Sequence, residues 1–66
     1  MTDLEIKEEL KKFRKRIFDI EGEEATEAYE IKEELDEFIK KHNVTAEQMM
    51  DFAISGAGEL LYMMTC

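Results

Sequence analysis

Five glutamates of this 66-residue chain recur at alternating intervals of four and three residues. They form what we call the acidic stripe: Glu23, Glu27, Glu30, Glu34 and Glu37. On a helix, this spacing places the carboxylates in one row about 20 Å long. Such a row could imitate the phosphates of a nucleic acid and occupy the basic groove of a nucleic-acid-binding protein, with salt-sensitive association. The simpler interpretation is a solvated face that keeps the protein in solution and faces the basic side of a neighbouring helix.

The groups that usually carry catalysis are scarce. His42 is the only histidine and lies at a predicted helix end, where it suits the helix dipole better than it suits catalysis. Cys66 is the only cysteine and has no histidine near it in sequence. One Cys and one His cannot complete a metal site, and the glycines Gly56 and Gly58 follow no strand, as those of a phosphate loop would. The sequence therefore predicts no enzyme, no cofactor and no metal site.

The acidic stripe overlaps a short motif. Glu34-Leu35-Asp36 resembles part of the Ser-Gln-Glu-Leu-Asp signature of the small sporulation aspartyl-phosphate phosphatases. In this chain Lys32 and Glu33 stand at the Ser and Gln positions, and the likeness covers one short segment. The resemblance implies a two-helix hairpin with a phosphatase-like regulatory role, in which Asp36 would be the functional residue. That family has no apolar third helix of the kind that this chain predicts.

The elements that must position these residues are predicted to be helices. The chain has no proline, and its apolar residues recur at helical spacing without alternating runs of Val, Ile and Thr. The pattern predicts helices over about residues 3–21, 23–42 and 46–64. Gly22 is the expected stop between the first two, because glycine tolerates the left-handed turn that often ends a helix.

Helix starts and inner faces can also be assigned from the residue pattern. Thr2 with Glu5, and Thr45 with Gln48, have the spacing of capping boxes. The apolar inner faces are Ile6, Leu10, Phe13, Ile17 and Ile20 on the first helix, and Ala28, Ile31, Leu35, Phe38 and Ile39 on the second. Short links favour antiparallel neighbours. We therefore expect an all-α fold with one domain over residues 1–66: a three-helix bundle of a long antiparallel helical hairpin and an apolar C-terminal helix.

The C-terminal helix is predicted to be apolar around an arc of about 200°, far wider than a surface helix needs. It therefore requires cover on two sides, from its own chain, from a protein partner or from a second copy, and we predict a homodimer or higher oligomer. The residues expected to make that association are Met49, Phe52, Ala53, Gly56, Leu60, Met63 and Met64. Ser55-Gly56-Ala57-Gly58 leaves two alternatives open. Small residues could let another helix approach closely, or the helix could break near Gly56.

Charge and hydropathy narrow the class of protein. The chain has 17 acidic and 9 basic residues, a net charge of −8. The basic run from Lys11 to Arg16 spreads around its helix, and the acidic remainder repels phosphate, so direct nucleic-acid binding is not expected. The apolar part of the last helix spans about 16 residues, short of the roughly 20 that cross a membrane. With no signal-peptide pattern and a lone thiol, the prediction is a cytoplasmic protein without a membrane segment.

Together these features predict a small acidic non-enzymatic protein-binding module. It would act as an inhibitor or regulator by occupying a partner protein's surface, as small proteins encoded by phages or mobile elements do. Two alternatives remain: the phosphatase-like regulator implied by Glu34-Leu35-Asp36, and a structural self-assembly module.

Overall fold

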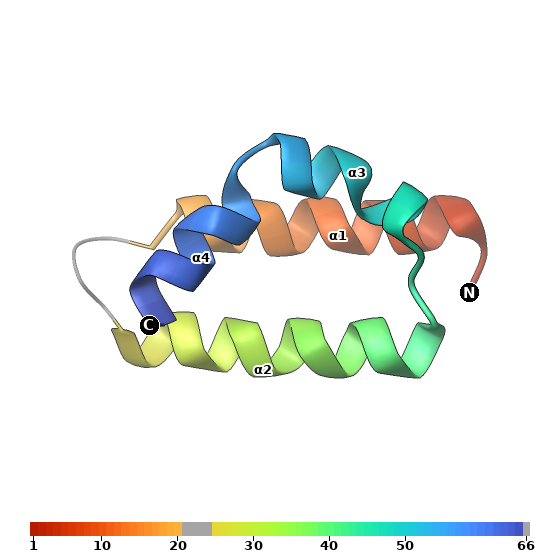
Figure 1. Ribbon diagram of the computed structural model, residues 1–66. Helices are drawn as coiled ribbons and strands as arrows, with labels where there is room; N and C mark the ends of the chain where they lie inside the picture. Colours follow the sequence, from red (N-terminus) through yellow and green to blue (C-terminus); the bar gives the residue numbers. More distant parts are fainter. Residues whose placement is uncertain (21–24, 66) are drawn as a thin grey trace.

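The computed structural model describes residues 1–20 and 25–65, and every regular element in these residues is an α-helix. The helices are α1 (Asp3–Phe18), α2 (Ala25–His42), α3 (Ala46–Ile54) and α4 (Ala57–Thr65). Helices α1 and α2 run antiparallel, α3 lies along α1, and α4 descends toward the start of α2 (Figure 1). The predicted all-α class is confirmed, whereas the predicted count of three helices is wrong, because four are present in the described part of the chain.

The additional helix arises because the expected C-terminal helix is divided at Ser55 and Gly56. The Ser55 hydroxyl donates to the Phe52 carbonyl at 2.6 Å and accepts from the Ala57 N–H at 3.3 Å, in competition with the helical ladder. Gly56 then adopts a φ of +84°, a left-handed conformation that glycine enters without steric cost. A Cβ added at Gly56 would meet no atom within 4 Å. The break is therefore confirmed, and close helix packing at Gly56 is wrong.

The capping boxes at the starts of α1 and α3 are confirmed. The Thr2 hydroxyl accepts from the Glu5 N–H and the Glu5 carboxylate accepts from the Thr2 N–H. Thr45 and Gln48 make the same reciprocal pair of bonds. These bonds satisfy backbone donors that the first turn of a helix leaves without partners.

The first helix ends earlier than residue 21, its predicted end. The last helical residue is Phe18, and the Ile20 N–H donates to the Ile17 carbonyl in a tightened final turn. The predicted stop at Gly22, the stripe residue Glu23 and the thiol of Cys66 lie outside the described residues.

The core lies where the inner faces of α1 and α2 meet α3 and α4. Helix α1 contacts all three other helices, whereas α2 contacts α1 and α4 but, over the described ranges, not α3. The inner faces predicted for the first two helices are confirmed, with Ile20, Phe38 and Ile39 packed at the margin. The buried residues are Ile6, Leu10, Phe13, Ile17, Ala28, Ile31, Leu35, Phe52, Ala57 and Leu61. Because α2 leaves α3 uncovered, α3 keeps an outer side that no other described helix shields.

Helix α4 is fastened to the start of α2 by a side-chain hydrogen bond. The Tyr29 hydroxyl donates to the Thr65 carbonyl at 2.8 Å, and the buried Thr65 hydroxyl donates to the Leu61 carbonyl at 2.8 Å. The first bond satisfies a carbonyl near the end of α4 that has no partner within the helix. The Tyr29–Thr65 hydrogen bond thereby helps to fix the orientation of α4, whose side facing away from the core is exposed to solvent.

Candidate protein-interaction surface

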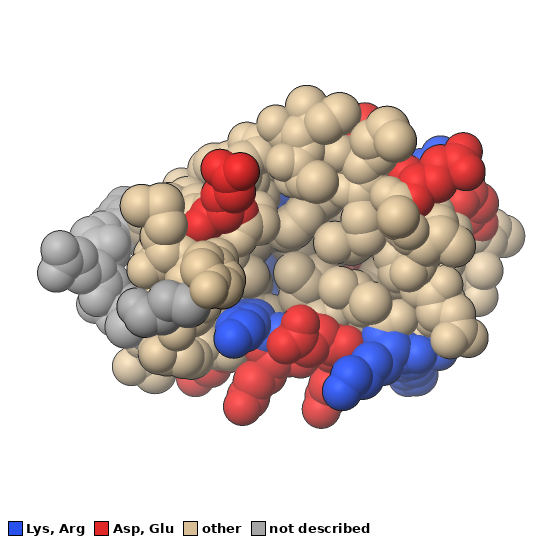
Figure 2. All heavy atoms as spheres, viewed as in Figure 1, with Lys and Arg blue, Asp and Glu red and all other residues tan. Residues whose placement is uncertain are grey.

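Large apolar side chains are exposed on the outer sides of α3 and α4. Ile54 is 76% exposed, Met63 is 73% exposed, and Met50 and Tyr62 are also more than half exposed. With the exposed Ala53 these side chains form what we call the outer apolar surface. In Figure 2 the part of the molecule over α3 and α4 carries few charged side chains, while red and blue side chains gather along the edge formed by α2. An apolar exposure of this kind is typical of protein-interaction sites.

The charged residues of α3 and α4 are all acidic. Between Ala46 and Thr65 they are Glu47, Asp51 and Glu59, and this stretch contains no Lys or Arg. All three carboxylates are exposed. On α3, Glu47 and Asp51 are one turn apart, so they form a short acidic row beside Met50 and Ile54. Any charge that these two helices add to the outer apolar surface is therefore negative.

The residues predicted to mediate association are distributed over four environments. Ala53 and Met63 are exposed and belong to the outer apolar surface. Three more are partly buried against the core, namely Met49, Leu60 and Met64. Gly56 lies at the break between α3 and α4, and Phe52 is buried in the core at 5% exposure. Phe52 therefore supports the surface from inside and does not contribute to its exposed area.

Sequence reasoning left out the two most prominent side chains of α3, Met50 and Ile54. Both lie in the stretch predicted to be one continuous apolar helix over about residues 46–64. Each lies two residues from the buried Phe52, and two residues turn an α-helix by about 200°. Taking Phe52 as the inward-facing residue would have placed Met50 and Ile54 on the opposite, outer side of α3.

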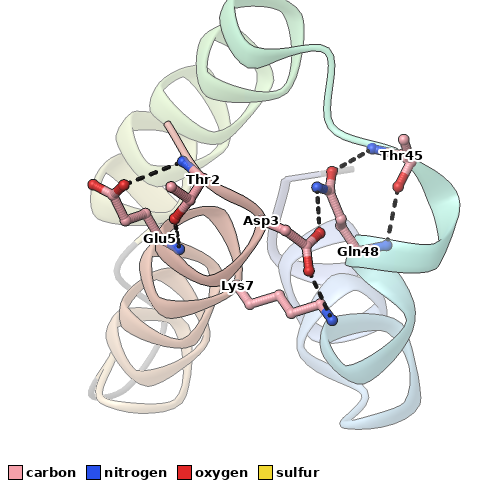
Figure 3. Close-up of polar contacts among 6 residues, drawn as sticks. All are labelled: Thr2, Asp3, Glu5, Lys7, Thr45 and Gln48. Carbon is pink, nitrogen blue, oxygen red and sulfur yellow. Dashed lines mark hydrogen bonds and ion pairs between the residues drawn. The ribbon is translucent and has the colours of Figure 1, made fainter.

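A polar connection between α1 and α3 fixes the position of α3 and, with it, of the α3 part of the outer apolar surface. Gln48 Nε2 donates to Asp3 Oδ1 at 2.7 Å, and Lys7 Nζ lies 3.2 Å from Asp3 Oδ2 (Figure 3). The hydrogen bond from Gln48, followed by that from Lys7, lowers the pKa of the Asp3 carboxyl. The first turns of α1 and α3 are thus joined side chain to side chain, which sets the position of α3 along α1.

The acidic stripe lies on the exposed side of α2. Glu27, Glu30, Glu34 and Glu37 are all exposed, and Arg16 of α1 reaches Glu34 with an Nη2–Oε2 distance of 2.6 Å. The hydrogen bond to Glu34 raises the pKa of Arg16, with further contributions from the charges of Glu34, Glu27 and Glu30. The same hydrogen bond lowers the pKa of Glu34. A basic residue of α1 thus faces the stripe, as the interpretation of a solvated, internally paired face expects.

The remaining candidate groups are single side chains on α2. The His42 ring packs against Phe38 at 4.8 Å between centroids, and Phe38 contacts Phe13 of α1 at 5.7 Å, so His42 extends an aromatic row at the end of the hairpin. Asp36 is exposed. Within residues 1–20 and 25–65, no three His, Cys, Asp or Glu side chains are grouped so that they could hold a metal ion.

Comparison with known proteins adds no relative to this picture. No family model, no curated protein and no solved structure matches the chain. None of the helices in the described ranges is long and apolar enough to cross a bilayer. The likeness at Glu34-Leu35-Asp36 therefore rests on those residues alone.

Proposed function

We propose that this chain is a small acidic protein-binding module that inhibits or regulates a partner protein by occupying its surface, without chemistry of its own. The observation that carries the proposal is the exposure of Ile54 and Met63, two large apolar side chains at 76% and 73%. Burying one such side chain in an interface is worth about 1.5–3 kcal/mol. A few of them could offset the cost of association. A reducing, cytoplasmic setting, expected from the lone thiol, belongs to the same proposal.

The outer apolar surface is a better candidate for the binding site than the acidic stripe. Glu34 already has an intramolecular partner in Arg16, and acidic helix faces are common on small soluble proteins. The outer side of α3 has no such intramolecular cover, because α2 contacts α1 and α4 in the described residues and not α3. Binding through α3 and α4 would therefore bury surface that folding leaves in contact with water.

Affinity capture from a lysate of the source organism tests the proposal. The bait would be the wild-type chain, with Ile54→Asp as the test variant and Glu30→Gln with Glu37→Gln as the control. We expect a partner that wild type and control both retain and that Ile54→Asp loses, with circular dichroism showing that every bait is folded. Loss of the partner only in the control would assign binding to the acidic stripe. A lysate in which no protein distinguishes the three baits would argue against a binding module.

A further inference from the structure

The chemistry around the outer apolar surface specifies what should cover it. We propose that this surface binds an amphipathic helix of a partner protein, one whose apolar face is bordered by lysine or arginine. The inference rests on the proposed function and names the class of partner. It draws on the spacing of the apolar side chains, on the acids beside them, and on the absence of basic residues from α3 and α4.

The apolar side chains of α3 have the spacing that a second helix can use. Met50, Ala53 and Ile54 are exposed at intervals of three and one, so they lie on one side of α3. Ala53 is small and lies beside Met50, one turn further along α3, so it leaves room for a side chain of a helix packed alongside. Methionine is flexible and polarisable, and it adapts to such partners, as it does on other surfaces that receive amphipathic helices.

The acids border the apolar side chains on both helices. On α3, Glu47 and Asp51 lie beside the exposed apolar side chains. On α4, Glu59 precedes Tyr62 and Met63 by three and four residues, so it lies one turn from both. None of these three carboxylates forms an ion pair with another residue of the described chain. They are therefore available to basic side chains of a partner.

The basic residues that line a hollow beside α3 belong to α1. Lys7, Lys11 and Arg14 line a small hollow between α1 and α3, together with Asp51, but they do not pair with it. Asp51 borders this hollow, whereas Met50 and Ile54 do not. Since α3 itself has no basic residue, the charged side chains of α3 that a helix packed on Met50 and Ile54 would meet are carboxylates.

A second copy of the chain fits this surface less well. A symmetric pair that buried α3 against α3 would bring like surfaces together, including the carboxylates of Glu47 and Asp51 from both copies. Each copy also carries a net charge of −8, which opposes association. A basic helix instead meets carboxylates of opposite charge and gains from long-range attraction. Charge complementarity therefore favours a basic partner over self-association.

Two designed peptides of 18 residues test this inference with the full chain. Both have the same leucine pattern on one helix face, and they carry either lysine or glutamate on the other. Fluorescence anisotropy measures their affinity for wild type and for folded variants at physiological salt. We expect the lysine peptide to bind wild type and the glutamate peptide to bind at least about tenfold more weakly. Equal affinities, or no binding of the lysine peptide, would overturn the inference.

The variants distinguish binding of the lysine peptide at α3 and α4 from non-specific attraction between opposite charges. Ile54→Asp makes the chain more acidic, so attraction alone would strengthen binding of the lysine peptide, whereas loss of an apolar contact should weaken it about tenfold or more. Glu47→Lys with Glu59→Lys should also weaken it, and Glu30→Lys with Glu37→Lys, which changes the net charge equally, should have much less effect. Tighter binding by Ile54→Asp, or equal effects of the two double variants, would contradict the inference.

Sedimentation of the wild-type chain tests whether a second copy of the chain, instead of a basic helix, covers the outer apolar surface. We expect a monomer of 7.8 kDa at 100 µM. A dimer that Ile54→Asp dissociates would make a second copy the occupant and would refute the basic partner. If lysate capture through Ile54 succeeds while the lysine peptide fails to bind, the proposed function stands and only the chemistry assigned to the partner is wrong.

Discussion

Gln48 and Asp3 lie 45 residues apart in the sequence, yet Gln48 Nε2 donates to Asp3 Oδ1 at 2.7 Å. The same glutamine completes the capping box of α3, because its Oε1 accepts from the Thr45 N–H at 2.9 Å. One amide group therefore caps its own helix with its oxygen and fastens that helix to α1 with its nitrogen (Figure 3). This division of roles distinguishes glutamine from glutamate at a position where the capping box accepts either residue.

The first prediction follows from that distinction. Gln48→Glu keeps an acceptor for the Thr45 N–H but removes the donor to Asp3 and places two carboxylates face to face. We expect the melting temperature to fall by a few degrees, measured by circular dichroism at pH 7. Adding Asp3→Asn to this variant restores a donor at position 3 and should recover most of the loss. A double variant no more stable than Gln48→Glu would show that the connection does not stabilise the fold.

The second prediction compares the two glycines of the break. Gly56→Ala forces a side chain into the left-handed region at a φ of +84° and should destabilise the fold by about 1 kcal/mol or more. Gly58→Ala lies inside α4, where its Cβ would meet Phe52 Cε1 at 3.5 Å, an ordinary contact. It should stabilise the fold by about 0.4–1 kcal/mol. Urea unfolding measures both, and effects of the same sign would contradict the assignment of Gly56 to the turn.

The third prediction concerns the core. Leu35→Ala removes a buried side chain of α2 and should cost about 2–5 kcal/mol, and Phe13→Ala on α1 should cost about as much. For a chain this small, either loss is a large share of a total stability near the low end of about 5–15 kcal/mol. Ile54→Ala removes an exposed side chain of similar size and is the control, with an expected effect below about 0.5 kcal/mol. A large loss for Ile54→Ala would place that residue in the core.

The fourth prediction is a pH dependence of the Arg16–Glu34 pair. The pKa of Glu34 is lowered in the folded state, so the pair contributes stability above the unfolded pKa of about 4.3. That contribution is lost as the pH falls through the lower, folded-state pKa. A double-mutant cycle of Arg16→Gln and Glu34→Gln should give a coupling of about 0.2–1 kcal/mol at pH 7, as for other exposed pairs. It should give almost none at pH 2, and a coupling that persists there would indicate an interaction other than the ion pair.

The features that the sequence predicted best depend on neighbours along the chain. The capping boxes at Thr2 and Thr45 depend on residues three positions away, and the inner faces of α1 and α2 follow from the helical repeat. The break at Gly56 was harder to decide, because a small residue suits close packing and a left-handed turn equally well. The φ of +84° and the open space around Gly56 in the folded chain separate the two.

The exposed surface was harder to predict for a related reason. A helical wheel drawn through residues 46–64 assumes a constant rotation of about 100° per residue. The left-handed turn at Gly56 interrupts that rotation, so residues of α3 and α4 that share a side of the wheel face different directions in the fold. The wheel therefore places Phe52 and Met63 on the same side, although Phe52 is buried and Met63 is exposed. The exposure of Met50 and Ile54 depends on which helices lie beside α3. In the described residues α2 packs against α1 and α4 and not against α3, and the sequence of α3 alone does not indicate this.

The break at Gly56 also has a consequence for local stability. It leaves α3 and α4 with nine residues each, shorter than the roughly 12–15 at which isolated helices become even marginally stable in water. Helix α3 therefore depends on its packing against α1, and α4 on its packing against α1 and α2, so the segment from Ala46 to Thr65 should open more readily than the long hairpin. In hydrogen exchange the helical amides of α3 and α4 should exchange before those of α1 and α2 in the free protein. A partner seated on α3 and α4 should slow them most, so amide protection would reveal occupancy of the surface even where the fold does not change.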